Sequence, residues 1–336
     1  MKKPSVSFVI PTWNRHRELD RLLSSIFMQD RTDYETIVVD NGSTDGTSQW
    51  LETLGHRVVR ITNPWNRGAA HAKNQGVSVA VARWIWFLDS DSELQDAGVV
   101  GRALRIVQES AQIGAIGGEM VPDGVGGLQC RIKRHLPTGE TENVLRAGEV
   151  RLEPCDYVPT CNCLVRRDLV VAWGGFDPSY FIFGEDDELG VAVRGLGFPC
   201  FFDSRLTVAH RFAPTSRRPG LWLSNRNRLR LAVLNFPAPR VALLPLLEIR
   251  EALRIDNLRV LAGIADSSLL ARYLPGTGCR SGVLQRVTSP LVFGLRYGAT
   301  LAAAYVYTAI TLPRLLALRR RRPDYLERLS AEGVPT

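Results

Sequence analysis

The sequence lacks the features that would direct a protein out of the cell or cross-link it with disulfides. Its first apolar stretch, Val6–Ile10, is interrupted at Ser7 and ends at a proline, so it is too short for the apolar part of a secretory signal peptide. The six cysteines form no Cys-x-x-Cys pair and no His-Cys finger spacing. Cys161 and Cys163 would supply only half of a zinc site, and buried free thiols fit the pattern better. We therefore expect a cytoplasmic, reduced protein.

Lysine is absent from residues 211–336, and the charge of the chain is divided unevenly. Residues 1–210 contain 22 Lys+Arg and 27 Asp+Glu, a net charge of −5, whereas residues 211–336 contain 20 Arg and 7 acids, a net charge of +13. No nucleic-acid-binding motif accompanies the basic excess, so no nucleic-acid partner is expected. A length of 336 residues, with 45% apolar and 23% charged residues, fits one globular fold of 200 to 250 residues plus an extra module.

Strand-like and helix-like patterns alternate over residues 1–111. Apolar residues from Leu19 to Phe27 follow the spacing of one helix face, and residues 69–82 also predict a helix. Four apolar runs are typical of buried strands: Val6–Ile10, Thr36–Val39, Val58–Ile61 and Trp84–Leu88. This alternation predicts a parallel sheet covered on both faces, and such sheets bind ligands beyond the carboxyl ends of their strands.

Polar clusters follow the predicted strands at that edge. Asp89-Ser90-Asp91 comes directly after the apolar strand 84–88, so both carboxylates could face one divalent cation of the Mg²⁺ or Mn²⁺ type. The alternative is a solvated turn or a helix cap at Asp91. Likewise, Asp40 could accept a hydrogen bond from a nucleobase imide, while the backbone amides of the loop after it line a nucleotide slot. The alternative is a glycine-containing loop whose Ser and Thr residues cap a helix.

Two further segments carry candidate chemistry. Gly68 precedes a helix of small residues that would let a ligand approach its N-terminus, while Trp65 nearby is expected to pack rather than stack. The run 185–188 contains four consecutive acids between apolar flanks, so it is either a solvated face or a group whose crowding raises one pKa toward that of a general base. His210 follows the β-like run Phe201–Val208 and is either structural or a third ligand for the cation.

The organisation changes along the chain. Residues 1–111 predict a nucleotide-binding half, and the glycine-rich residues 112–215 predict a mixed-sheet half of the same domain, 1–215. Residues 216–336 predict an Arg-rich helical region.

That C-terminal region contains Tyr297–Leu312, which is 16 residues without a charge and shorter than the ~20 residues of a spanning helix. The alternatives are a buried helical hairpin packed on the catalytic domain or an interfacial segment with Arg319–Arg322 on anionic lipid, and a true span is less favoured than either. The arginines 226, 228 and 230 could instead neutralise a phosphate on an acceptor.

Six ordered motifs in residues 5–212, nearly two thirds of the chain, together resemble the family 2 glycosyltransferases. They are Val9-Ile-Pro-Thr-Trp-Asn14-Arg15, Ile37-Val-Val-Asp40-Asn41-Gly-Ser43, Asn66-Arg-Gly68, Lys73-Asn74-Gln-Gly76, Phe87-Leu-Asp89-Ser-Asp91, and Gly174-Gly-Phe-Asp177 ahead of Gly184-Glu185-Asp186. The resemblance implies an α/β GT-A fold, a Rossmann-like nucleotide-binding half fused to a mixed-sheet acceptor half, with a C-terminal helical extension. Within the family the chain is most similar to the bacterial rhamnosyltransferase-type branch.

The resemblance also implies roles for individual residues. The donor nucleotide sugar would be held by Pro11, Thr12, Asn14, Asp40, Ser43, Asn66, Gly68, Lys73, Asp89 and Ser90. Mg²⁺ or Mn²⁺ would be held by Asp89, Asp91 and His210. Asp186 would be the general base and Glu185 would orient the acceptor, with Asp187 as a rival for the base because the acidic run departs from the usual family pattern.

The activity implied is inverting transfer of a sugar, rhamnose among the candidates, from a dTDP- or UDP-sugar to an acceptor hydroxyl. The acceptor would be a glycan, a lipid-linked saccharide or a small natural product. A nucleotidyltransferase and a non-catalytic, membrane-docked nucleotide-sugar-binding protein are the alternatives. Attachment to the cytoplasmic face of a membrane through the basic region, and assembly as a homo-oligomer, are compatible with the sequence.

Overall fold

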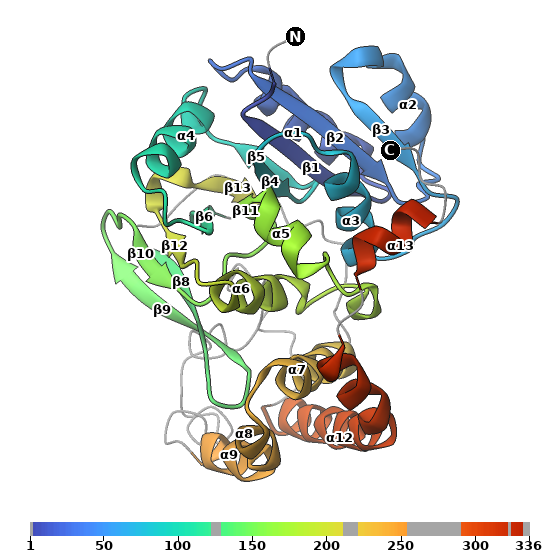
Figure 1. Ribbon diagram of the computed structural model, residues 1–336, viewed down its shortest axis with the longest axis vertical. Coiled ribbons are helices and arrows are strands. Elements are labelled where there is room, and N and C mark those ends of the chain that lie inside the picture. The colour runs from blue at the N-terminus through green and yellow to red at the C-terminus, as the bar shows by residue number, and fades with distance from the viewer. Residues whose placement is uncertain (1–2, 122–128, 211–220, 254–289, 322–323, 332–336) are drawn as a thin grey trace. The chain divides into compact units, whose positions relative to one another are not determined.

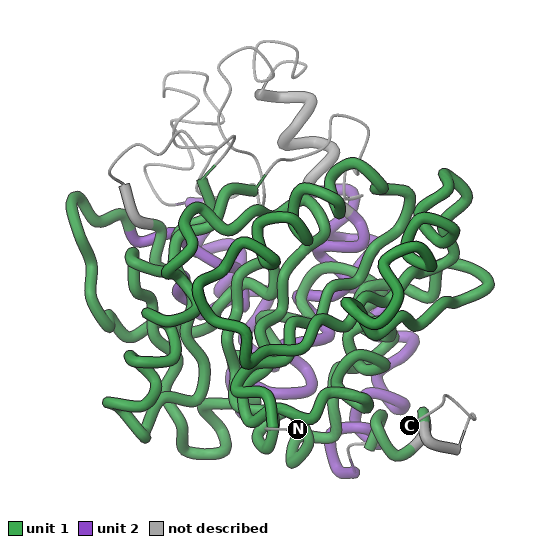
Figure 2. The backbone as a smooth tube through the Cα atoms, turned by 90° about the horizontal axis from the view of Figure 1, so that it is seen from above, with its two compact units in different colours: residues 1–132, 145–213, 323–336 green, residues 133–144, 214–322 purple. Residues whose placement is uncertain are grey.

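The computed structural model describes residues 3–121, 129–210, 221–253, 290–321 and 324–331. The chain divides into two compact units (Figure 2). Unit 1 comprises residues 1–132, 145–213 and 323–336, and unit 2 comprises residues 133–144 and 214–322. The predicted domain boundary at residue 215 lies two residues from this division, but a short internal segment belongs to unit 2 and the C-terminal segment belongs to unit 1.

Unit 1 is built on one eight-stranded sheet (Figure 1). The strand order is β10 (Glu153–Cys155), β12 (Cys200–Phe202), β6 (Ala115–Gly117), β11 (Asn162–Arg166), β4 (Trp84–Leu88), β1 (Val6–Thr12), β2 (Tyr34–Asp40) and β3 (Val59–Thr62). Only β10 and β11 run antiparallel to their neighbours in this sheet. The predicted α/β architecture, with a mainly parallel central sheet, is therefore confirmed.

The helices of unit 1 follow the strands as the alternation predicts. They are α1 (His16–Phe27), α2 (Thr47–Thr53), α3 (Ala69–Val79), α4 (Val99–Glu109), α5 (Arg167–Trp173) and α6 (Glu185–Gly195), with short 3₁₀ turns at Gly55–Arg57 and Pro178–Tyr180. The predicted helix over 69–82 is too long at its C-terminal end. Ala80 is already extended, and the next two amides donate to the side chains of Glu35 and Ser7, so the backbone leaves the helix there.

A small second sheet brings residue 210 to the edge of the main sheet. It contains β5 (Ser92–Leu94), β13 (Val208–His210) and β7 (Met120–Val121), and it pairs His210 with Ser92. A separate hairpin is formed by β8 (Gln129–His135) and β9 (Thr141–Ala147), and its tip belongs to unit 2.

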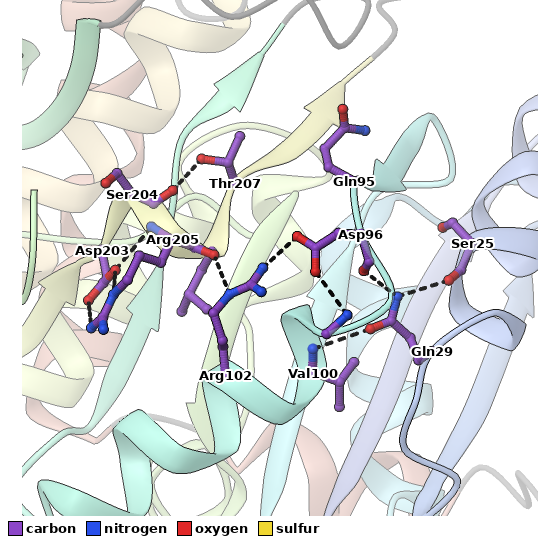
Figure 3. Close-up of polar contacts among 12 residues, drawn as sticks. Ser25, Gln29, Gln95, Asp96, Val100, Arg102, Asp203, Ser204, Arg205 and Thr207 are labelled. Carbon is purple, nitrogen blue, oxygen red and sulfur yellow. Dashed lines mark hydrogen bonds and ion pairs between the residues drawn. The ribbon is translucent and has the colours of Figure 1, made fainter. Parts of the chain in front are cut away.

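The prediction of one β-like run over Phe201–Val208 is wrong, because a 3₁₀ turn at Ser204–Leu206 separates β12 from β13. Asp203 holds this turn: its carboxylate accepts from the backbone amide of Arg205 at 3.0 Å and from the guanidinium at 2.7 and 2.9 Å. Arg102 of α4 in turn donates to the carbonyl of Arg205 and pairs with Asp96 (Figure 3). These contacts fix the direction in which β13 starts.

A last helix, α13 (Tyr325–Ala331), returns to unit 1 after unit 2. It packs on α3, with Leu329 buried. The amide of Tyr325 donates to the carbonyl of Gly174 at 2.8 Å. A helix encoded far from α3 therefore covers part of its surface.

Unit 2 contains α7 (Leu221–Asn235), α8 (Ala238–Ala242), α9 (Leu244–Ala252) and α12 (Pro290–Arg320). Its small core joins α7, α9 and α12 through Leu229, Ala232, Phe236, Leu244 and Ala304. Arg228 is committed inside this unit, because it pairs with Glu248 at 2.5 Å and donates to the carbonyl of Thr138 at 2.8 Å. Part of the Arg228 guanidinium is therefore occupied within unit 2, and the predicted role of arginines 226, 228 and 230 toward an acceptor phosphate stays a prediction.

Candidate functional site

The ends of β1 and β2 place two polar side chains opposite each other. Thr12 and Asp40 are register partners at the carboxyl ends of these parallel strands, and both are buried. Asp40 Oδ1 accepts from the amide of Ser43 at 3.0 Å. Among the described residues, Asp40 Oδ2 and Thr12 Oγ1 have no hydrogen-bond partner. Because a buried unpaired carboxylate oxygen is costly, this pair is suited to accept a hydrogen bond from a ligand.

The loops after β1 and β2 hold each other in place. Asn14 adopts a left-handed backbone with φ of 52°, and its amide donates to Ser43 Oγ at 2.9 Å. Its side-chain oxygen accepts from the amide of Thr44 at 2.7 Å. Pro11 lies in β1 itself and is half-buried. The structure thus places Pro11, Asn14 and Ser43 at one sheet edge, while their contact with a donor stays a prediction.

An amide network organises the loop before α3. The oxygen of Asn66 accepts from the side chain of Asn41 and from the amide of Gly68, both at 2.9 Å. Trp65 in this loop is 64% exposed, so the expectation that its side chain packs is wrong. The backbone of Trp65, by contrast, packs closely against Gly42. A Cβ at residue 42 would lie only 2.6 Å from the Cα of Trp65.

Gly68 is required by the chain itself. It has φ of +88°, and a Cβ there would lie 2.7 Å from the carbonyl oxygen of Phe181. The same oxygen accepts from the amide of Ala69, the first residue of α3, at 2.7 Å. The absence of a side chain at Gly68 therefore lets the loop at Phe181 approach closely. The predicted role of Gly68 in binding the donor stays a prediction.

Lys73 carries a buried ammonium group from α3 into the acidic part of the site. Its side chain is 2% exposed, and Nζ lies 2.8 Å from Glu185 Oε1 and 2.5 Å from Thr160 Oγ1. Burial opposes the charge, but the carboxylates of Glu185, Asp89 and Asp186 outweigh it and raise the pKa of Lys73. Lys73 is therefore a permanent cation that neutralises part of the acidic cluster.

The Asp89-Ser90-Asp91 segment meets His210 as the sequence predicts. His210 Nε2 lies 3.6 Å from Asp89 Oδ2 and 3.3 Å from Asp91 Oδ1. Asp91 also forms an ion pair with the buried Arg15, whereas the side chain of Asp89 is 40% exposed. Ser90 between them is buried. Asp89 is thus the more accessible carboxylate, and Asp91 is tied into the protein.

Neighbouring opposite charges set the protonation states of Asp91 and His210. Burial disfavours the ionised form of Asp91, but the hydrogen bond with His210 and the charge of Arg15 outweigh it and lower the pKa of Asp91. Burial also disfavours the imidazolium of His210, yet Asp89 and Asp91 raise the pKa of His210 to about 9. A cation that binds here must therefore displace the imidazole proton.

Three ligand atoms in this group can meet one cation. A carboxylate oxygen of Asp89, the Sγ of Cys161 and a ring nitrogen of His210 all lie within 4.8 Å of one another. The carboxylate oxygen suits Mg²⁺ or Mn²⁺, whereas the thiol and the imidazole are ligands that softer transition ions such as Zn²⁺ prefer. The residues therefore fit a divalent metal, and the group includes Cys161, for which the sequence favoured a buried free thiol.

The four acids form the first turn of α6, which begins after Gly184 in a left-handed conformation. Glu185 and Glu188 are buried, and Asp186 and Asp187 are half-buried. Burial, followed by the nearby charges of Asp187 and Glu185, raises the pKa of Asp186 to about 8. The carboxylate of Glu185 bonds to Lys73 through one oxygen, and the other oxygen is buried with no partner among the described residues.

Residue patterns alone did not reveal two members of the site, Arg15 and Thr160, and they favoured a buried thiol over a metal ligand at Cys161. Arg15 stands in the first motif, but nothing in the spacing indicates that it pairs with Asp91. Cys161 differs from the other described cysteines, because Cys155, Cys163 and Cys200 are buried while Cys161 is half-buried. The expectation of free thiols holds for these four, and Cys130 and Cys279 lie outside the residues whose side chains are described.

The sheet order and the site at its carboxyl edge define a GT-A-like α/β domain. A mannosyltransferase from Pyrobaculum calidifontis, solved with GDP-Man and Mn²⁺, superposes with a TM-score of 0.53 over 91% of this chain and 87% of its own, at 19% identity. GalNAc-T7, solved with UDP, GalNAc and Mn²⁺, superposes with a TM-score of 0.56 over 85% of this chain and 56% of its own, at 15% identity. These likenesses show the fold.

The family follows from the sequence comparison. Residues 7–171 match the model of glycosyl transferase family 2.

Curated relatives support the same family. A PGL/p-HBAD biosynthesis glycosyltransferase of Mycobacterium bovis is 32% identical over 125 residues, which is 36% of this chain and 48% of the relative. An Escherichia coli UDP-Glc:alpha-D-GlcNAc-diphosphoundecaprenol beta-1,3-glucosyltransferase is 36% identical over 87 residues, 26% of this chain and 34% of the relative. The chain spans about half the length or less of these relatives, and they do not single out a rhamnosyltransferase branch.

Proposed function

We propose that the chain transfers a sugar from a nucleoside-diphosphate sugar to an acceptor hydroxyl with inversion at the anomeric carbon. The observation that carries the proposal is the acidic cluster, in which Asp186, with its raised pKa, and Asp89 both act on the buried ammonium of Lys73. A carboxyl group whose pKa lies near the working pH is suited to general-base catalysis. The cluster therefore joins a proton acceptor to the predicted cation site.

The residues divide the chemistry between them. Thr12 and Asp40 would bind the nucleobase through their unpaired buried oxygens. Asp186 would accept the proton of the acceptor hydroxyl, and Glu185, held by Lys73, would orient that hydroxyl through its remaining oxygen. Asp89, Cys161 and His210 would hold a divalent cation, which when bound stabilises negative charge on the leaving diphosphate.

The identities of the donor and of the acceptor are more specific proposals. We include dTDP- and UDP-sugars, rhamnose among them, because of the motif resemblance. One relative's name contains a diphosphoundecaprenol acceptor, which supports a lipid-linked saccharide as the acceptor class. The free thiols of Cys155, Cys161, Cys163 and Cys200 support a cytoplasmic location.

A panel of donors tests the proposal. With Mn²⁺ present, one nucleoside-diphosphate sugar should raise the melting temperature of the protein and release its nucleoside diphosphate, and removal of the metal with EDTA should abolish both effects. Pyrophosphate release from a nucleoside triphosphate and sugar phosphate would instead establish a nucleotidyltransferase. Thermal stabilisation without turnover on any donor or acceptor would establish a non-catalytic binder.

The metal group has its own test. Mn²⁺ with UDP should slow alkylation of Cys161 by iodoacetamide about tenfold once the metal exceeds its dissociation constant tenfold, because a ligated thiolate cannot react. Peptide mass spectrometry measures the rate at each cysteine, and the buried Cys155 and Cys200 serve as internal references. Asp89→Asn should remove the protection. Equal rates with and without Mn²⁺ would exclude Cys161 from the cation site.

A further inference from the structure

The helix α12 in unit 2 has two different sides. Ala304, Thr308 and Leu315 are buried and lie four and seven residues apart, so they form one stripe. The side chain of Asn225 on α7 donates to Thr300 of α12 at 3.2 Å, and Ala304 belongs to the core that α7 shares. The packed side of α12 is therefore covered by α7.

The opposite side of α12 is apolar and open. Ile310 is 74% exposed, Val306 61% and Leu316 42%. Residues 298–320 form a helix long and apolar enough to cross a membrane, yet only 11% of its most apolar stretch is buried. Most of this stretch is therefore exposed in unit 2, while the alternative of a buried helical hairpin packed on the catalytic domain stays a prediction.

Helix α9 of the same unit also exposes apolar side chains. Leu246, Ile249 and Leu253 are 63%, 57% and 62% exposed. α9 and α12 each contribute to one small core, because Leu244 and Ala304 belong to the same buried cluster as Leu229 of α7. We call the exposed side chains 246, 249, 253, 306, 310 and 316 the apolar face of unit 2. Such a concentration of exposed apolar residues is typical of an interaction site.

The charge on the α12 part of this face has one sign. Residues 298–321 contain no acid, and Arg314, Arg319, Arg320 and Arg321 follow the apolar residues of α12. All four arginines are exposed at the residue level. A second copy of the chain would bring the same positive charges together, whereas an anionic surface would attract them.

We propose that the apolar face of unit 2 docks in the plane of an anionic lipid leaflet, with these arginines at the headgroups. The in-plane orientation follows from α7, whose Asn225 and Arg228 would enter the hydrocarbon if α12 crossed it. The uncharged stretch 297–313 also covers only about 25 Å, less than the ~30 Å of a hydrocarbon core. A helix with one apolar side and flanking arginines is suited to the interface.

Flotation of the full chain with vesicles tests this proposal. We expect binding to vesicles containing about 30% phosphatidylglycerol, weaker binding to pure phosphatidylcholine, and loss of the difference at high salt. The double variant Ile310→Glu with Leu316→Glu should reduce binding to the anionic vesicles roughly tenfold or more. Met28→Glu is the matched control, because Met28 is 70% exposed in unit 1. Circular dichroism melts establish that both variants fold.

Each other result overturns the proposal. Equal binding by the double variant and by the control would show that the apolar face does not meet lipid. A dimer in solution that the double variant dissociates, with no vesicle binding by the natural chain, would assign the face to a second copy. Resistance of the chain to carbonate extraction from cell membranes would establish a span. Donor hydrolysis in solution, measured on the same variants, reports separately on the proposed function.

Discussion

Replacing Asp186 with asparagine should lower sugar transfer by roughly 10³-fold. Asparagine keeps the shape of the side chain but cannot accept the proton of the acceptor hydroxyl. Nucleotide binding should survive, because the described hydrogen bonds of Asp186 and Asp40 go to their own neighbours, Asp187 and Ser43. Turnover and nucleotide affinity, measured by product release and calorimetry, check both halves of this expectation. Asp187→Asn is the matched control, and an active Asp186→Asn beside an inactive Asp187→Asn would reassign the base.

The pH dependence of kcat/KM also tests the assignment of Asp186 as the general base. Because the pKa of Asp186 is raised to about 8, kcat/KM should increase with pH and level off above that value as the carboxylate forms. The measurement needs saturating Mn²⁺, since protonation of His210 otherwise weakens metal binding at low pH. A profile that is already flat at pH 6 would contradict a base of this kind.

The same carboxyl group should make the natural protein less stable than the variant. An unfolded chain loses the Asp186 proton near its ordinary pKa of 3.8, whereas the folded chain holds it until about 8. Between these values the folded state binds more protons, so its stability falls as pH rises. Asp186→Asn should therefore melt at a higher temperature than the natural chain at pH 8, and the difference should vanish near pH 4.

The second large effect is expected at Lys73. Lys73→Met should lower the free energy of unfolding by about 3–5 kcal/mol, because it leaves the buried carboxylate of Glu185 without its cation. Arg60→Met is the comparison, since Arg60 pairs with Glu52 at an exposed position and should contribute about 1 kcal/mol or less. Urea unfolding monitored by fluorescence measures both.

A compensating variant distinguishes charge from packing. Lys73→Met combined with Glu185→Gln removes both charges and should recover most of the lost stability without restoring turnover. If the double variant were as unstable as Lys73→Met alone, the loss would come from the packing of the lysine chain, and the ion pair would not be what holds α3 to α6.

The sequence predicted the parts of the fold that are locally determined. β4 is a continuous apolar run, β1 and β2 are centred on shorter apolar runs, and α1 buries one regular stripe, so the alternation was sufficient. The break between β12 and β13 was missed, because it depends on Asp203 holding Arg205 in a short turn. Similarly, α3 ends early only because Glu35 and Ser7 capture its next amides.

The sequence indicated which residues form the candidate site, but it indicated less well which of them contact each other. The meeting of Asp89 and Asp91 with His210 was expected from the motif resemblance. The pairing of Lys73 with Glu185 was not, because the two are 112 residues apart and the loop between Asp177 and Glu185 turns through left-handed backbones at Phe181 and Phe183. No spacing rule predicts such a loop.

The place of α13 in the chain affects how the protein is made. Residues 214–322 of unit 2 are translated before the helix that covers α3 and buries Leu329. During that interval unit 1 has already emerged from the ribosome with part of the α3 surface uncovered, which is the condition under which apolar surface recruits chaperones or aggregates. A frameshift or nonsense mutation anywhere in unit 2 would therefore damage the folding of unit 1 as well.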